Sequence, residues 1–187
     1  MDRGARGEHG MSNLERNVAN FCGAAMAGIK PASLAVCGPG EREELLSFSE
    51  IFRKKGIRIE LLGTKNGKLT YLAFRENKLK DHLALRENAA FLRKFGYPVH
   101  NFEGCIDFLK LRLLCECYPH EVGVFLGYPV EDIAGYMNDP GGCIFSGVWK
   151  VYARPEEKRA LFERYKRCTD CIVKRLLGGK ALAEIFR

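Results

Sequence analysis

The sequence predicts an α+β fold, in which a small, mainly antiparallel sheet is covered by several helices. Two β-type runs, at 57–63 and 68–74, flank Asn66-Gly67, a pair that supplies the positive φ angles of a hairpin turn. Residues 144–153, IFSGVWKVYA, alternate in the manner of a strand, and we expect them to join the sheet of this hairpin. The remaining segments have the apolar spacing of helices.

The helical segments lie on both sides of the hairpin. The first runs from Asn13 to about Ala25, and IKPASLAVC follows it as an extended segment. GPGEREELLSFSEIFRKKG predicts a second helix, with acidic residues in its first turn, basic residues in its last and a glycine at its end. Helical spacing returns over 76–97 and 103–118. A proline then opens a final long helix whose buried stripe is predicted to be Leu161, Tyr165, Cys168, Ile172 and Leu176.

Length and composition are typical of a globular protein. The chain has 187 residues, 47% of them hydrophobic, and we expect a single globular domain over 11–187. Glycine and charge dominate the first decapeptide, which predicts a disordered tail at 1–10. No apolar run approaches the roughly 18 residues that a membrane span needs, and no secretory signal pattern is present. We therefore expect a cytoplasmic protein with no membrane partner.

The positive charge is concentrated at the C-terminal end. Residues 150–187 carry 11 Lys and Arg against 5 Asp and Glu, whereas the whole chain has a net charge of +7. A basic helix can contact nucleic acid or another acidic partner. Most such helices simply face solvent, and no DNA- or RNA-binding motif accompanies this one. Nucleic-acid binding through the terminal helix, with Lys158 and Arg159 among its cations, is thus one alternative function.

The eight cysteines are expected to stay reduced in a cytosolic protein. Cys115 and Cys117 form one close pair, and Cys168 and Cys171 form another, which falls within the final helix. Paired metal-binding cysteines usually lie in turns, where both thiolates can converge on the ion. The histidines also lack a metal-binding spacing, because Val124 stands where a zincin helix would carry its second histidine. We therefore predict no metal site.

The segment PHEVG, at 119–123, can be interpreted as a helix start or as a functional site. Proline suits the first helical turn, and Glu121 complements the positive end of the helix dipole. The same arrangement of proline and acid recurs at 129–132, so we expect two short helices in tandem. His120 is not explained by helix initiation, and we expect its imidazole and free backbone N–H groups to face a concave site.

Four blocks of sequence resemble a known family. AGIKPASL (27–34), AFR (73–75), PHEVGVFLGYPVEDIAGY (119–136) and GVWKVY (147–152) are similar to a family of anaerobic, largely clostridial bacteria catalogued as domain of unknown function 3793. The resemblance spans residues 20–180. The family carries no assigned activity, but its members tend to be encoded near flavodoxin and iron-uptake genes. The resemblance therefore implies a redox or iron-linked role.

The polar residues of these blocks are our candidate ligand-binding residues. Their cationic and aromatic chemistry suits an anionic ligand such as a phosphate, a carboxylate or a flavin-like cofactor, if they converge in the fold. The leading hypothesis is thus a binding or redox-accessory protein, with a small anionic ligand or a redox protein as its partner. An enzyme that uses His120 and Glu121 as acid and base is the other alternative. The sequence does not identify a cofactor. The ligand-binding candidates are Lys30, Arg75, His120, Tyr128, Lys150 and Tyr152.

Overall fold

A computed structural model of the chain describes residues 11–186, so the tail expected at 1–10 lies outside the described residues. The fold is α+β, as the sequence predicts. In chain order the elements are α1 (Asn13–Met26), β1 (Ala32–Cys37), the 3-10 helix η1 (Pro39–Glu41), α2 (Arg42–Arg53), β2 (Ile57–Lys65), β3 (Lys68–Arg75), α3 (Glu76–Ala84), α4 (Arg86–Arg93), α5 (Phe102–Leu114), α6 (Val122–Phe125), α7 (Val130–Asn138), β4 (Phe145–Ser146), β5 (Lys150–Val151), α8 (Pro155–Leu177) and α9 (Leu182–Ile185).

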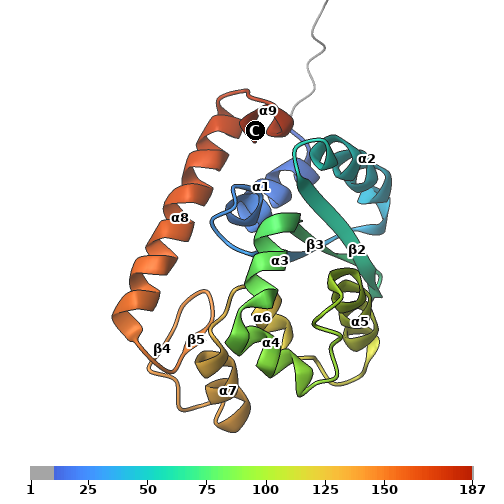
Figure 1. Ribbon diagram of the computed structural model, residues 1–187. Coiled ribbons are helices and arrows are strands. Elements are labelled where there is room, and N and C mark those ends of the chain that lie inside the picture. The colour runs from blue at the N-terminus through green and yellow to red at the C-terminus, as the bar shows by residue number, and fades with distance from the viewer. Residues whose placement is uncertain (1–10, 187) are drawn as a thin grey trace, which may run out of the picture.

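The central sheet contains three antiparallel strands in the order β1-β3-β2 (Figure 1). β2 and β3 form the predicted hairpin, with Lys65 paired to Lys68 across the turn. Asn66 and Gly67 have φ angles of 52° and 73°, the left-handed values that a two-residue turn of this kind requires. The hairpin prediction is confirmed, and its local signal was this Asn-Gly pair.

Both faces of the sheet are covered by helices. Side chains of the central strand β3 alternate between the two faces, as the pleat dictates. Tyr71 and Ala73 pack with α1, α2 and the C-terminal half of α8, whereas Leu72 and Phe74 pack with residues of α3 to α7. Tyr71 and Phe74 are both fully buried. The sheet is therefore the middle layer, and α3 to α7 build a separate helical layer on one side of it.

The second strand prediction is wrong in one respect. Residues 144–153 do not join the central sheet but fold back on themselves as a separate two-stranded hairpin, β4–β5. The chain reverses at Gly147, whose N–H donates to the carbonyl of Trp149 at 3.0 Å. The ring of Phe162 covers this glycine so closely that a Cβ atom would lie 2.3 Å from it. A local turn packed against α8 thus replaces the expected long strand.

The helical segment predicted at 76–97 is divided in two. Leu85 adopts an extended ψ of 134° between α3 and α4. The buried side chain of Asn88 stabilises this corner by donating to the carbonyl of His82 at 2.8 Å. The ring of His82 in turn reaches α6, where Nε2–H donates to the carbonyl of Val124 at 2.9 Å. α3 therefore fixes the position of α6.

The long helix α8 runs along one side of the molecule, from the β4–β5 hairpin to α9 (Figure 1). Its predicted apolar stripe packs inward, with Tyr165, Ile172 and Leu176 buried and the other two members half-buried. Charged residues occupy much of its remaining surface. Along residues 11–186, no helix combines the length and apolar character needed to cross a bilayer.

Replacing Gly67 by alanine should destabilise the protein, because the left-handed conformation costs a residue with a Cβ atom about 1 to 2 kcal/mol. Urea unfolding of the two proteins measures the difference in free energy. Gly40→Ala is the matched control, since no atom lies within 4 Å of the added Cβ and its φ is not positive. Equal stability of the Gly67→Ala variant and the wild type would contradict this account of the turn.

Candidate functional site: an aromatic pocket

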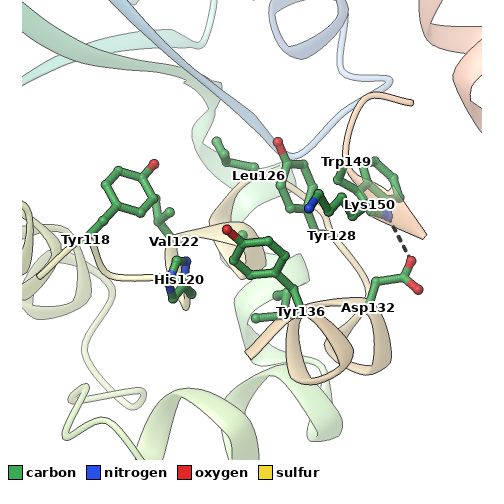
Figure 2. Close-up of a pocket in the computed structure, with 11 residues that line it drawn as sticks. Tyr118, His120, Val122, Leu126, Tyr128, Asp132, Tyr136, Trp149 and Lys150 are labelled. Carbon is green, nitrogen blue, oxygen red and sulfur yellow. Dashed lines mark hydrogen bonds between the residues drawn. The ribbon is translucent and has the colours of Figure 1, made fainter. Parts of the chain in front are cut away.

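A pocket of about 270 Å³ opens between the segment that contains α6 and α7 and the β4–β5 hairpin (Figure 2). Five of its eleven lining residues carry rings, and Lys150 contributes an ammonium group. Its apolar floor includes Val122, Leu126 and Ile133. We refer to this cavity as the aromatic pocket, after the ring-bearing members of its lining, Tyr118, His120, Tyr128, Tyr136 and Trp149.

The segment PHEVG forms a tight turn that leads into α6. The N–H groups of Val122, Gly123 and Val124 donate to the carbonyls of residues 119, 120 and 121 at 3.0 to 3.1 Å. α6 itself begins at Val122 and comprises only four residues. The two tandem helices are present, but these N–H groups are occupied within the turn. The expectation of free backbone donors facing the site is therefore wrong for residues 122–124.

Glu121 is a buried ion-pair partner instead of a helix cap. Its carboxylate is only 2% exposed and accepts from Nε of Arg112 at 2.7 Å. Glu121 makes no side-chain bond to the helix N-terminus. Burial and this nearby carboxylate raise the pKa of Tyr97. Glu121 thus holds the turn against α5 and is not among the residues that line the pocket.

His120 is exposed and lies in the pocket wall. Its ring centroid lies 5.0 Å from that of Tyr136 and 5.9 Å from that of Tyr118. Among residues 11–186, no hydrogen bond joins His120 to Glu121. The two side chains that the sequence offered as an acid-base pair are therefore divided between the pocket and the core.

The carboxylate of Asp132 connects α7 to the β4–β5 hairpin. Asp132 is only 2% exposed, and its carboxylate accepts three hydrogen bonds. Trp149 Nε1–H donates at 2.8 Å, and the N–H groups of Tyr152 and Ala153 donate at 2.8 and 3.1 Å. Lys158 Nζ lies 4.0 Å away and supplies a positive charge. These bonds fix the indole, which stacks on Tyr128 with centroids 4.6 Å apart, at one end of the pocket (Figure 2).

Lys150 places its ammonium group beside the rings. Nζ donates to the carbonyl of Pro140 at 2.7 Å and lies 5.4 Å from the ring centroid of Tyr136. An ammonium group has three N–H donors. The contact with Pro140 fixes the side chain and uses one of them, so two donors remain for a ligand.

The other candidate residues lie outside this pocket. Arg75 donates to the carbonyls of Met26 and Lys55 at 2.7 and 3.1 Å, and so links the end of α1 to the segment before β2. The hydroxyl of Tyr152 donates to the carbonyl of Asp139 at 2.8 Å. Lys30 lines a neighbouring cavity, with Nζ 5.9 Å from the centroid of Tyr128. Of the six candidates, the structure brings together His120, Tyr128 and Lys150.

The basic face expected on α8 is smaller than its sequence indicates. Lys158 is buried and donates to Glu131 at 2.9 Å, and the guanidinium of Arg159 lies 4.0 Å from the ring centroid of Phe145. Burial opposes ionisation of Glu131, but hydrogen bonds from Arg154 and Lys158 outweigh it and lower its pKa to about 2. Lys158 therefore serves internal packing, whereas Arg159 stays exposed beside the ring of Phe145.

Sequence reasoning missed most of the aromatic wall. Tyr118, Tyr136 and Trp149 were not among the candidates, and Asp132 was interpreted only as an acid in the first turn of a helix. Asp132 and Tyr136 stand four residues apart on α7, a spacing that puts both on one helix face. Both side chains line the pocket. Their spacing was therefore the signal in the sequence that could have identified Tyr136.

The cysteines are all free thiols. Cys22, Cys37 and Cys105 are buried, and burial raises the pKa of each thiol. Within the part of the chain that the structure describes, no three side chains of His, Cys, Asp or Glu come together in a way that could hold a metal ion. The buried thiols thus act as small apolar side chains in the core.

These features define an α+β protein with an aromatic pocket beside an ammonium group. The chain belongs to the family described as "Protein of unknown function (DUF3793)", whose model matches residues 18–186. No curated protein matches the chain. No solved structure matches it either. The family resemblance noted from the sequence is thereby confirmed.

Replacing Asp132 by alanine should lower the free energy of unfolding by about 3 to 5 kcal/mol, the usual cost of removing one partner from a buried charge pair. Three N–H donors would lose their acceptor, and Lys158 would keep Glu131 but lose its second carboxylate neighbour. The control is Glu157→Gln, which removes an exposed partner of Arg154 and should cost at most about 0.5 kcal/mol. Denaturant unfolding compares the two, and similar small losses would contradict the anchoring role of Asp132.

Proposed function

We propose that the protein is a binding protein whose aromatic pocket takes a small anionic ligand with a planar ring system. The observation that carries this proposal is the arrangement of the five rings around one cavity that the ammonium group of Lys150 also reaches (Figure 2). Rings bind other rings by offset or edge-to-face stacking, and Lys150 would balance the charge of the ligand. Neither feature alone would select this class of ligand.

The size of the pocket limits the ligand. Its volume of about 270 Å³ lies just below the usual range of about 300 to 1,000 Å³ for small-molecule sites. A single ring system fits such a volume, whereas a complete dinucleotide would extend beyond it. A flavin-like ring that carries one phosphate satisfies the proposal, with the rest of the molecule outside the pocket. Such a ligand would also account for the redox or iron-linked role that the family resemblance implies.

The charges of the pocket support an anion. Asp132 is part of the lining, but its oxygens are occupied by the three N–H donors of the hairpin. Burial raises the pKa values of Tyr118 and Tyr128, so both hydroxyls stay protonated at neutral pH. They can donate hydrogen bonds to a negatively charged group. The donors available to a ligand therefore outnumber the acceptors.

Binding is better supported than catalysis. An acid-base pair needs its two groups within reach of one substrate. Glu121 is buried against Arg112, and His120 stands in the pocket wall without a carboxylate bonded to it among residues 11–186. His120 would contact the ligand and could accept a proton from it. An enzyme would have to take its second group from elsewhere in the pocket.

Calorimetric titration with flavin mononucleotide and adenosine monophosphate tests the proposal, and riboflavin and inorganic phosphate serve as partial ligands. Trp149 is the single tryptophan of the chain and lines the pocket, so its emission gives a second readout. We expect a phosphorylated aromatic probe to bind more tightly than either part alone. Lys150→Met should weaken binding by at least about tenfold, because a charge-assisted hydrogen bond is lost.

The controls separate binding from folding. Lys174→Met removes an equal charge from the exposed surface of α8 and should leave the affinity unchanged. His120→Ala should weaken binding while costing less than about 1 kcal/mol of stability, as is usual for an exposed side chain. If neither aromatic phosphate changes the emission of Trp149 or releases heat, the proposed ligand class is wrong.

A further inference from the structure

A second cavity, of about 370 Å³, adjoins the aromatic pocket. Its walls come from α1, the start of β1 and the middle of α8, and it shares Leu126 and Tyr128 with the aromatic pocket. The lining is mostly apolar, with Phe21, Leu34 and Phe162 among its members. We call it the second cavity. Two polar side chains of its wall set its chemistry.

The first is Lys30, which is partly buried in this wall. Among residues 11–186, no carboxylate pairs with its ammonium group, and its one described contact through Nζ is the ring of Tyr128 at 5.9 Å. Burial lowers the pKa of Lys30 to about 8. The ammonium group has thus lost much of its hydration without gaining an opposite charge, which is unfavourable for the folded protein.

The second is Ser33, on β1. This residue is only 2% exposed, and its hydroxyl is buried without a hydrogen-bond partner in the described part of the chain. Buried hydroxyls are nearly always hydrogen-bonded, so an exception calls for an explanation. Ser33 and Lys30 belong to the same cavity wall. The wall of one cavity therefore contains an ammonium group and a hydroxyl that both lack an acceptor in the described part of the chain.

We propose that the second cavity binds a small apolar monocarboxylate, such as a short aliphatic or aromatic acid. One carboxylate has two oxygens, which can accept from Lys30 and from Ser33 together. Its apolar tail would lie against Phe21, Leu34 and Phe162. Phe21 is 64% exposed in the structure, and the tail would cover part of this ring.

The charge at the rim favours a carboxylate over a phosphate. Lys166 is already paired with Asp170 at 2.6 Å, so it is not an additional free cation. Both residues line the cavity. The carboxylate of Asp170 would repel a dianion more strongly than a monoanion. A single free ammonium group therefore matches a single negative charge.

The test is calorimetric titration of the full chain with hexanoate and benzoate, each compared with the neutral amide of the same shape. We expect each acid to bind at least tenfold more tightly than its amide. Lys30→Met should abolish this preference, and Ser33→Ala should weaken the binding of both acids several-fold. Equal affinity for acid and amide in the wild type, or an unchanged preference in Lys30→Met, would overturn the proposal.

Two controls make the result specific. Lys174→Met removes a charge from α8 away from the cavity and should bind hexanoate as the wild type does. Lys150→Met alters the aromatic pocket and should also leave hexanoate binding unchanged, so failure of the proposed function and failure of this proposal are distinguishable. Loss of hexanoate binding in Lys150→Met would mean that the acid occupies the aromatic pocket, and would refute the second site.

Thermal unfolding at pH 7 tests, without a ligand, whether the ammonium group of Lys30 lacks a counter-charge. Lys30→Met should unfold at a higher temperature than the wild type, because the variant no longer buries an ammonium group that lacks a counter-charge. Hexanoate should raise the unfolding temperature of the wild type but not that of Lys30→Met. A lower unfolding temperature for the variant would show that Lys30 has a stabilising partner, and the proposal would fail.

Discussion

The bonds of the Asp132 carboxylate are the constraint on which the pocket depends. A two-stranded hairpin as short as β4–β5 is not stable by itself in water. Asp132 connects it to α7 through the indole of Trp149 and two backbone N–H groups, and Lys158 balances the buried charge from α8. Three consecutive segments of the chain, α7, the β4–β5 hairpin and α8, thereby meet at one carboxylate. Trp149, Tyr136 and Lys150 have fixed relative positions because of this meeting point.

The polar groups that can bind a ligand in the pocket are those whose hydrogen-bonding capacity is not used within the protein. Arg75, Tyr152 and Glu121 have the chemistry of functional residues, but each forms bonds within the protein. His120 and Lys150 keep donor or acceptor capacity on the cavity side. Residue type thus identifies candidates, whereas the hydrogen-bond partners decide which candidates remain available to a ligand.

Local signals explain which parts of the fold could be predicted. Asn66-Gly67 sets its turn through its own backbone angles, and the stripe of α8 follows from helical periodicity, so both were found from sequence. The membership of 144–153 in a sheet depends on a distant partner, and alternation alone does not name that partner. Glu121 looks like a helix cap in the sequence because its partner, Arg112, belongs to a different helix. Tyr118 and Trp149 were missed for the same reason, since only tertiary packing brings them to the aromatic wall.

The ring of Tyr128 forms part of the wall between the aromatic pocket and the second cavity. It stacks on Trp149 and lies near Lys30, and both cavities count it among their wall residues. A ligand that displaces this ring in one of the two cavities must change the shape of the other. Thermodynamic linkage makes any such effect mutual: the factor by which the first occupant alters the affinity for the second equals the factor in the reverse direction. One phenol ring would therefore couple ligand binding in the aromatic pocket to ligand binding in the second cavity.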